Sequence, residues 1–458
     1  MYYWRKLNFQ INESLQKSDT FGILAQLIEN ESLSFDEMQA LQWRSMEKLM
    51  RHAYDTVPFY RTLWKKHGIT PADIRHYDDF AEKVPIIDKD DVRPHFEAMK
   101  SSVPQPGVFR VNTSGTTGAP TPFLRDGLAR SYAMACRARG RHWWGVNMLD
   151  TEVRFWGRSS EFSKSMKVQV RDRLKRFKDN RVGISYCPTF DMKPENMAQY
   201  RQLILRKKPA LILGYPSAFY SFAKFLKDQG TDIHEAGVPL VNFTSEALYE
   251  AQRELIAEVM SPRIASEYGS IENGIAGFDC ARQSHHIMEE DTYLESCRVK
   301  GEDDQIIVTN LNAFAFPLIR YNMEDRGKIY APSHCQCGRP LRVLELQQGR
   351  VMDYIWKRDG SFVVSNMFMF SILPCLQDIR GASRYQLVQH SLDEIEVKVQ
   401  TSVTLPTVTV DTISENIRKL CGAHVNAYVT ETEEIPVERS GKFRFIRSHI
   451  KRDELKKG

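Results

Sequence analysis

The chain has 458 residues, of which 42% are hydrophobic and 26% are charged. These proportions are typical of a folded soluble protein, and they exclude a disordered or fibrous chain. The 63 Lys and Arg residues exceed the 58 Asp and Glu residues by a net charge of only +5. A dedicated nucleic-acid-binding protein carries a more strongly basic surface, so we expect no nucleic-acid partner.

The first residues and the number of cysteines bear on the cellular location of the protein. The first residues lead into Asn, Glu and Gln rather than into an apolar segment, so they do not predict a secretory signal. No apolar run reaches the roughly 18 residues that a membrane-spanning helix needs. The 8 Cys residues are scattered along the chain, which is typical of a reducing compartment. We therefore expect a cytoplasmic location.

The predicted elements fall into three stretches in chain order. Residues 1–105 show apolar positions at helical spacing, as at Met46, Leu49 and Ala53, and predict a helical lead-in. Residues 108–346 alternate short apolar runs with helical patterns; the clearest strand candidates are 109–111, 210–213, 240–244 and 306–310. After a turn-rich stretch at 349–360, alternation at 394–399 and a helical pattern at 412–421 predict a small α+β unit. We expect an α/β protein with a large N-terminal domain of mixed sheets and helices, residues 1–348, and a small C-terminal α+β domain, residues 349–458.

Residues 164–181 form a basic amphipathic pattern. Met166, Val170, Leu174 and Phe177 recur at helical spacing, and eight Lys and Arg residues surround them. Such a helix can lie on an anionic lipid surface or meet an acidic partner. The simpler interpretation, which the pattern favours, is a solvated helix whose apolar stripe packs on the core. Membrane contact stays the weaker hypothesis, to which the aromatic and basic residues at 2–6 add some support.

The most informative loop is rich in glycine and hydroxyl residues. Thr113, Ser114, Gly115, Thr116, Thr117 and Gly118 follow a strand-like run. Their backbone N–H groups and hydroxyls can surround the oxygens of a polyphosphate. An ordinary surface loop has a similar composition. The loop lacks the Gly-Lys-Ser/Thr ending of a Walker motif, and by itself it moderately favours phosphate binding.

Four further motifs follow in order: Tyr268-Gly-Ser-Ile-Glu272, Arg320-Tyr-Asn-Met-Glu-Asp325, Gly349-Arg-Val-Met-Asp353 and Ser440-Gly-Lys442. Together with Thr113 to Pro120, they resemble the adenylate-forming superfamily, in its phenylacetate-CoA ligase-like branch, which includes members associated with capsule biosynthesis. Residues 51–60 and 214–217 are also similar to this branch, so the resemblance covers nearly the whole chain.

This resemblance implies an activity and a moving domain. It implies that ATP and a carboxylic acid give acyl-AMP and pyrophosphate, and that an acceptor then takes the acyl group. CoA is the default acceptor of the family, and an amine is the alternative, as in an amide ligase of polysaccharide or secondary-metabolite biosynthesis. The C-terminal domain would act as a lid that rotates between the two half-reactions.

The resemblance also assigns roles to residues. Residues 113–118 would cradle the triphosphate, Tyr268 would pack on the adenine, and Glu272 would bind Mg²⁺. Asp325 would accept hydrogen bonds from the ribose, and Lys442 would bring its charge to the α-phosphate and carboxylate. Arg350 would contact the nucleotide from beside the hinge. The remaining nucleotide-binding candidates are Ser245, Glu246, Gly269 and Ser270.

The chain departs from the family pattern at two positions. Ile271 stands where the family commonly has Ser or Thr before the motif Glu, and Met352 stands at the usual hinge Asp, with Asp353 one residue later. The first change bears on phosphate geometry and the second on lid rotation. Neither removes the residues that acyl-AMP formation would use.

A metal site is predicted from Cys spacing. Cys335 and Cys337 share one short segment, and Cys280 is followed by His285 and His286. Three Cys and one His are a common closed ligand set for structural Zn²⁺. The grouping is similar to that of zinc-carrying members of this branch, and that similarity selects His286 as the ligand and His285 as the spare. Unrelated structural residues are the alternative interpretation.

Two other classes of function remain open. A non-catalytic nucleotide-binding member of a biosynthetic complex would keep the phosphate loop, and a peripheral membrane scaffold would rest on the basic helix. Glu272, Asp325 and Lys442 favour an enzyme, because a binding protein needs no mobile lysine. By their position in the family order, Trp143, Trp144 and residues 154–160 are candidates for the acyl pocket, although a double Trp more often lies in a core.

Overall fold

The computed structural model describes residues 2–112, 121–157, 166–189, 192–245, 248, 250–299, 302–347, 354–376, 379, 382–435 and 445–450. The chain begins with helices, as predicted: α1 (Tyr2–Gln16), α2 (Thr20–Glu29), α3 (Phe35–Thr56), α4 (Pro58–Lys66), α5 (Tyr77–Lys83) and α6 (Lys89–Val92). Ser34 and Glu37 form a capping box at the start of α3. Met46, Leu49 and Ala53 are fully buried in the first core cluster, which confirms the predicted apolar face.

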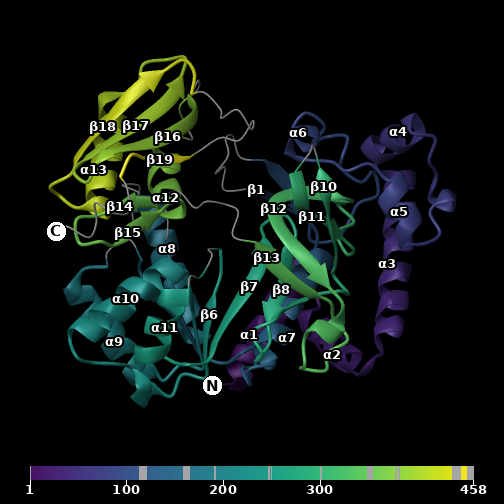
Figure 1. Ribbon diagram of the computed structural model, residues 1–458, viewed down its shortest axis with the longest axis horizontal. Coiled ribbons are helices and arrows are strands. Elements are labelled where there is room, and N and C mark those ends of the chain that lie inside the picture. The colour runs from purple at the N-terminus through teal and green to yellow at the C-terminus, as the bar shows by residue number, and fades with distance from the viewer. Residues whose placement is uncertain are drawn as a thin grey trace.

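One large sheet forms the centre of the molecule (Figure 1). Its 11 strands run in the order β10-β11-β12-β13-β9-β8-β7-β6-β5-β3-β4. The pairs β4-β3, β3-β5, β5-β6 and β6-β7 are parallel, and the pairs from β7 onward to β10 are antiparallel. The sheet therefore has a parallel half and an antiparallel half that meet at β7.

The parallel half alternates with helices, because parallel strands need crossover connections. Its strands are β3 (Glu152–Phe155), β4 (Ile184–Cys187), β5 (Leu211–Gly214), β6 (Leu240–Phe243) and β7 (Ile264–Ser270). The helices are α7 (Gly127–His142), α8 (Met166–Arg181), α9 (Pro194–Lys207), α10 (Pro216–Asp228) and α11 (Glu250–Val259). β5 and β6 are buried along their whole length, as expected for strands covered on both faces.

The antiparallel half packs against the lead-in helices α3 to α5, to the right in Figure 1. Its strands are β8 (Gly274–Asp279), β9 (His285–Ile287), β10 (Thr292–Val299), β11 (Glu302–Asn310), β12 (Tyr321–Tyr330) and β13 (Val343–Gln347). A separate hairpin of β1 (Phe109–Asn112) and β2 (Pro122–Arg125) pairs Asn112 with Pro122. Residues 113–120, between the two strands of this hairpin, lie outside the described residues.

The C-terminal residues form a smaller unit with its own core. A four-stranded sheet of β16 (Ala382–Ser391), β17 (Glu394–Thr401), β18 (Asn426–Thr432) and β19 (Ile446–Ser448) packs with α12 (Ser365–Leu376) and α13 (Thr407–Cys421). The short hairpin β14 (Tyr354–Trp356) and β15 (Phe362–Val364) precedes it. The α+β character is as expected, while the predicted boundary at residue 349 lies outside the described residues and stays a prediction.

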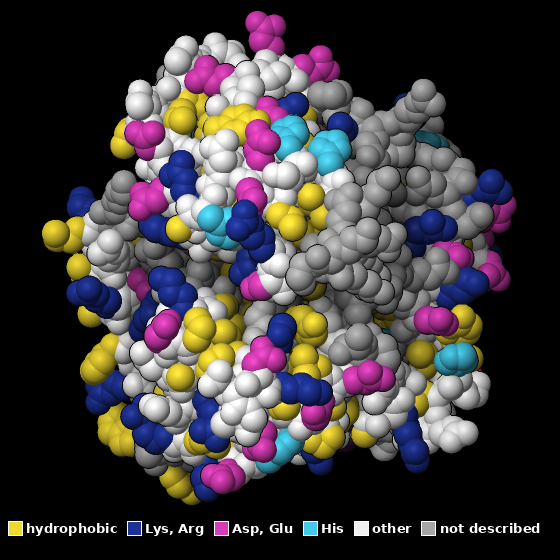
Figure 2. Space-filling view, turned by 60° about the vertical axis from the view of Figure 1, so that its left-hand side comes forward, with side chains coloured by type: hydrophobic (Ala, Val, Ile, Leu, Met, Phe, Trp, Pro, Cys, Tyr) yellow, Lys and Arg dark blue, Asp and Glu magenta, His cyan; other side chains and the backbone are white. Residues whose placement is uncertain are grey.

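In Figure 2, the C-terminal unit lies above the parallel half, and Lys and Arg side chains are intermixed with Asp and Glu side chains over both. The described part of α8 confirms the predicted helix but not its predicted packing. No residue of α8 is buried, so the interpretation that its apolar stripe packs on the core is wrong. No helix in the described part of the chain has the length and apolar content needed to cross a membrane.

Candidate functional site

The carboxyl edge of the parallel half brings together residues from distant parts of the sequence. Phe155 pairs with Gly214, Gly214 with Phe243, and Phe243 with Ser266. Ser245 lies two residues after Phe243 of β6, and Tyr268 lies two residues after Ser266 of β7, so both stand just beyond this row of paired residues. Ligands of open α/β sheets bind at this edge, so the structure brings both predicted residues to a suitable place.

The turn after Tyr268 depends on glycine. A Cβ on Gly269 would lie 2.2 Å from the carbonyl oxygen of Gly274, so a larger residue would force the chain apart at this bulge. Ser270 Oγ accepts a hydrogen bond of 3.1 Å from the backbone N–H of Asn273. That contact closes the turn 271–273, which carries Ile271 exposed and Glu272 half-buried at the surface.

Arg125 joins this turn to the hairpin that flanks the predicted phosphate loop. Its guanidinium donates to the carbonyl oxygen of Ile271 at 3.2 Å and to that of Ala129 at 2.7 Å. Burial lowers the pKa of Arg125, while the carboxylates of Asp291, Asp126 and Glu272 act to raise it. The sequence did not single out Arg125, because nothing in the local pattern of β2 shows that this arginine side chain is buried rather than exposed.

Tyr268 and Asp325 are in direct contact. The Tyr268 hydroxyl donates a hydrogen bond of 2.9 Å to Asp325 Oδ2 across 57 residues of sequence. The ring of Tyr268 also packs against the first core cluster, which orients the side chain. The two motifs that were predicted to bind adenine and ribose are therefore neighbours.

Glu267, the residue before Tyr268, anchors the strand end. Its carboxylate receives two hydrogen bonds from Arg137, at 3.0 and 2.8 Å, and one of 3.1 Å from Asn242. Burial acts to raise the pKa of Glu267, but the Arg137 and Arg141 guanidiniums lower it below its usual value. The carboxylate thus fixes β7 to α7 and β6 beside the site.

Arg320, from the same motif as Asp325, points away from the site. Its guanidinium binds both carboxylate oxygens of Glu295, at 3.0 and 2.9 Å. It also donates to the carbonyl oxygens of Ala81 and Val84, at 2.6 Å each. Arg320 therefore ties β12, the strand that carries Asp325, to β10 and to the lead-in helix α5.

Several predicted residues lie outside the described residues. They are Thr113, Ser114, Gly115, Thr116, Thr117 and Gly118 of the predicted phosphate loop, with residues 158–160, Glu246, Arg350, Met352, Asp353 and Lys442. Their roles stay predictions. The described residues that the structure does bring to one region are Ser245, Gly269, Ser270, Glu272 and Tyr268, with Asp325 bonded to the last.

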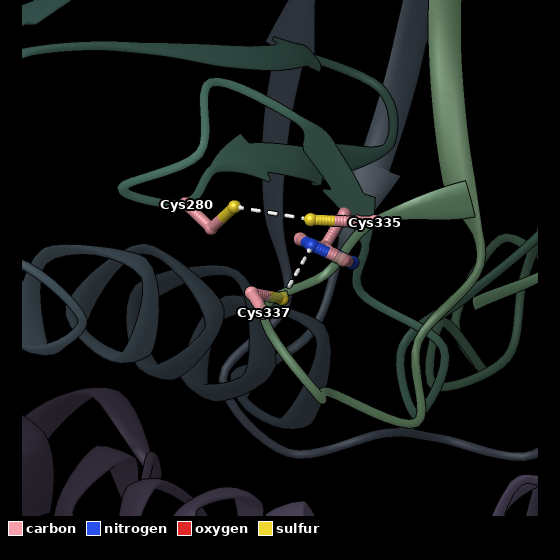
Figure 3. A group of neighbouring side chains, drawn as sticks. Cys280, Cys335 and Cys337 are labelled. Carbon is pink, nitrogen blue, oxygen red and sulfur yellow. Dashed lines mark hydrogen bonds between the residues drawn. The ribbon is translucent and has the colours of Figure 1, made fainter. Parts of the chain in front are cut away.

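The predicted metal ligands come together in a cluster of three Cys and one His. One ligand atom each of Cys280, His286, Cys335 and Cys337 lies within 4.8 Å of the others. Cys280 Sγ and Cys335 Sγ are 3.7 Å apart, and Cys337 Sγ is 3.1 Å from His286 Nε2. Figure 3 shows the sulfur atoms of the three labelled Cys side chains directed into one small region.

The two His residues face different partners. His286 Nδ1 donates to the carbonyl oxygen of Leu341 at 3.1 Å, which leaves Nε2 directed at the cysteines. His285 Nδ1 instead lies 2.6 Å from Asp279 Oδ1. His286 is thus the residue that joins the cluster, as the resemblance predicted, and His285 does not.

The aromatic candidates divide between two places. The rings of Trp143 and His286 meet edge-to-face with centroids 6.0 Å apart, so Trp143 packs beside the Cys–His cluster. Trp144 is buried in the fourth core cluster, as a core residue rather than an acyl-pocket residue. Trp156 stacks on Tyr215 at 4.7 Å, just beyond the ends of β3 and β5. Tyr215 was missed because its ring reaches the edge only through the parallel pairing of these strands.

Comparisons with known proteins agree with this architecture. The CapK C-terminal domain family matches residues 355–449. The phenylacetate-coenzyme A ligase of Thermus thermophilus is 25% identical over 402 residues, which are 82% of this chain and 84% of the relative. That of Aromatoleum evansii is 26% identical over 353 residues, which are 71% of this chain and 73% of the relative.

A solved structure shares the fold across both units. 2-Hydroxyisobutyryl-CoA ligase in complex with 2-HIB-AMP and CoA, in its thioesterification state, superimposes with a TM-score of 0.59 at 20% identity. The match covers 91% of each chain. The chain is therefore similar to phenylacetate-coenzyme A ligases over most of its length, matches the CapK C-terminal domain family over residues 355–449, and shares the fold of a solved CoA ligase.

Proposed function

We propose that the protein activates a carboxylic acid with MgATP to give enzyme-bound acyl-AMP and pyrophosphate, and then transfers the acyl group to the thiol of CoA. In the first step the acid carboxylate attacks the α-phosphorus and pyrophosphate leaves. In the second step the thiol sulfur attacks the acyl carbon, and AMP leaves. An arylacetic acid is the first substrate class to test, because the curated relatives are phenylacetate-coenzyme A ligases.

The hydrogen bond between Tyr268 and Asp325 carries this proposal. A carboxylate held at 2.9 Å from a tyrosine hydroxyl, beside the carboxyl ends of parallel strands, is suited to accept hydrogen bonds from ribose hydroxyls. The adjacent ring offers a face on which adenine can stack. A purely structural role would not require both groups at the ligand-binding edge of the sheet.

Glu272 is our candidate Mg²⁺ ligand. It stands half-buried on the turn that Arg125 holds through the carbonyl oxygen of Ile271. Its carboxylate offers the hard oxygen that Mg²⁺ prefers. Because Arg125 belongs to the hairpin that flanks residues 113–120, the metal and the triphosphate would be held by connected parts of the chain.

ATP–pyrophosphate exchange tests the first half-reaction. The enzyme is assayed with phenylacetate and with aryl, short-chain, fatty, hydroxy and amino acids, beside the Asp325→Ala variant. Exchange with one acid class that is lost in the variant supports the proposal. ATP binding without exchange for any acid would favour a non-catalytic nucleotide-binding protein instead.

The acceptor is tested separately. Enzyme loaded with acyl-AMP is given CoA, an amine, or neither, and thioester and amide are measured. Thioester formation supports the CoA ligase, and amide formation without thioester would show the alternative acceptor chemistry. This assay does not depend on the identity of the lid residues.

We further propose that Cys280, His286, Cys335 and Cys337 bind one structural Zn²⁺. Zinc–sulfur bonds of about 2.3 Å in a tetrahedron place two sulfur atoms roughly 3.8 Å apart, and the Cys280 and Cys335 sulfurs are 3.7 Å apart. The hydrogen bond from His286 to a backbone carbonyl is the usual support of a metal-binding imidazole. The ion would tie β8 and β9 to the segment before β13, away from the Tyr268 turn.

Elemental analysis of protein purified without chelator tests the site. We expect about one zinc per chain, since four protein ligands form one closed site. Cys280→Ser should lose the metal, while Cys297→Ser, at a half-buried cysteine outside the cluster, should retain it. Zinc-free wild-type protein of full stability, or equal zinc in both variants, would contradict this assignment.

A further inference from the structure

Helix α8 turns its polar side inward and its apolar side outward. Only Asp172, Arg176 and Asp179 are partly covered, and they lie on one side of the helix. On this side, Asp179 accepts a hydrogen bond of 2.8 Å from the Tyr186 hydroxyl of β4. A surface helix of a globular protein has the opposite arrangement, because burial of its apolar face drives its packing.

The exposed stripe of α8 is strongly apolar. Met166 is 78% exposed, Leu174 is 59% exposed and Phe177 is 62% exposed, and Val170 completes the stripe at the same helical spacing. Lys167, Arg171, Lys175 and Lys178 run beside it along one flank. A shallow groove of about 840 Å³ is lined by Met166, Val170 and Leu174 of the stripe and by the four basic residues.

Helix α1 repeats this inverted arrangement. Arg5, Phe9, Glu13 and Gln16 face the protein, whereas Tyr3, Leu7, Ile11 and Leu15 are exposed at every fourth position. Trp4, beside this row, is 71% exposed. Two helices with outward apolar stripes indicate a surface that the described parts of the chain leave uncovered.

The two helices meet at one end. Arg5 of α1 donates to the carbonyl oxygen of Leu149 at 3.2 Å, and a Cβ on Gly183 would lie 2.8 Å from the Arg5 guanidinium carbon. Gly183 lies two residues after the end of α8, so the Arg5 side chain of α1 reaches the C-terminal end of α8. The ends of the two helices that carry the stripes are therefore neighbours.

The charge of α8 identifies the partner. The helix carries seven basic and two acidic residues, a net charge of +5 that equals the formal net charge of the whole chain. A symmetric contact with a second copy that paired α8 with α8 would bring these charges together and repel. An apolar stripe with Trp, Phe and Leu, bordered by Lys and Arg, matches the boundary between the headgroups and acyl chains of an anionic bilayer.

We propose that α8, with α1 beside it, docks the protein on an anionic membrane surface, with the apolar stripes at the level of the headgroups and the basic flank on the phosphates. The docking is peripheral and reversible, since each stripe buries only a few side chains. The docking uses none of the residues assigned to nucleotide or metal binding, so it can be tested independently of the proposed ligase activity.

Flotation of the full-length protein with vesicles tests this proposal. One set of vesicles contains equal parts phosphatidylcholine and phosphatidylglycerol, and the other contains phosphatidylcholine alone. We expect binding to the anionic set at low salt, with little binding to the neutral set, and progressive release as salt is added. No binding to anionic vesicles at low salt, or equal binding to both sets, would overturn the proposal.

Matched double variants distinguish binding through the α8 surface from a general effect of net charge. Arg171→Glu with Lys175→Glu should weaken binding to anionic vesicles by at least about tenfold. Lys65→Glu with Lys66→Glu changes the net charge equally on the exposed end of α4 and should bind as wild type does. Equal loss in both double variants would overturn the proposal.

The apolar stripe is tested by Leu174→Glu, measured against vesicles and also by sedimentation without them. We expect weaker vesicle binding and a sedimentation coefficient identical to that of the wild type. A wild-type dimer that Leu174→Glu dissociates would show that the stripe pairs with a second copy, and it would overturn the membrane assignment. Unchanged urea unfolding of the variant confirms that the fold is retained, as expected for an exposed position.

Discussion

Replacing Tyr268 by Phe removes only the hydroxyl group from the candidate nucleotide site. The ring stays, so adenine can still stack, but the 2.9 Å hydrogen bond to Asp325 Oδ2 is lost. A hydrogen bond to a charged group contributes about 1.5–3 kcal/mol, and the half-buried position of Tyr268 suggests the lower end. Because the carboxylate then loses its fixed orientation, we expect the Kd for ATP to rise roughly tenfold.

The assay is ATP–pyrophosphate exchange, with ATP and with 2′,3′-dideoxy-ATP as substrates. Wild-type enzyme should discriminate against the dideoxy analogue, and Tyr268→Phe should discriminate less, since the hydroxyl acts through the group that binds the ribose. Tyr268→Leu, which also loses the ring, should be weaker still for both nucleotides. This pattern distinguishes the role of the hydroxyl from that of the ring.

A double-mutant cycle with Asp325→Ala tests the coupling directly. If Tyr268 acts through Asp325, the double variant should bind ATP no worse than Asp325→Ala alone. Additive losses, or a Tyr268→Phe variant with unchanged ATP affinity and unchanged ribose discrimination, would refute the reasoning.

Three further outcomes are expected. Arg320→Met should lower the free energy of unfolding by about 3 kcal/mol, measured by urea denaturation, because it leaves the largely covered Glu295 carboxylate without its bidentate Arg320 partner, and adding Glu295→Met should recover much of the loss. Lys442→Ala should abolish acyl-AMP formation in the exchange assay and still convert supplied acyl-AMP to thioester; equal loss of both steps would contradict lid rotation. Cys280→Ser should lower the melting temperature and the zinc content together, whereas a fall in one without the other would separate the cluster from metal binding.

Much of the architecture could be predicted because it depends on local patterns. The strands at 211–214, 240–243 and 394–401 and the helix at 407–421 follow from apolar periodicity and run length. The order of the motifs led to the resemblance to the adenylate-forming superfamily, since several short motifs in one order are specific when each alone is not. The same order predicted which Cys and His residues come together.

Other features depend on contacts between residues far apart in sequence. Periodicity identifies the faces of a helix but not which face the protein covers, so the stripe of α8 was expected to pack inward although it is exposed. Arg320 belongs to the same motif as Asp325, yet its side chain turns to Glu295 and the lead-in helices.

The sequence by itself determined the element types, the resemblance to a family and the chemistry that the motifs can support. The tertiary structure decided that Tyr268 bonds to Asp325, that Arg125 holds the Glu272 turn, and that α8 presents an apolar stripe to the surroundings. The physical reason is that hydrogen-bond partners and burial are set by strand pairing and packing between distant segments, which local patterns do not encode.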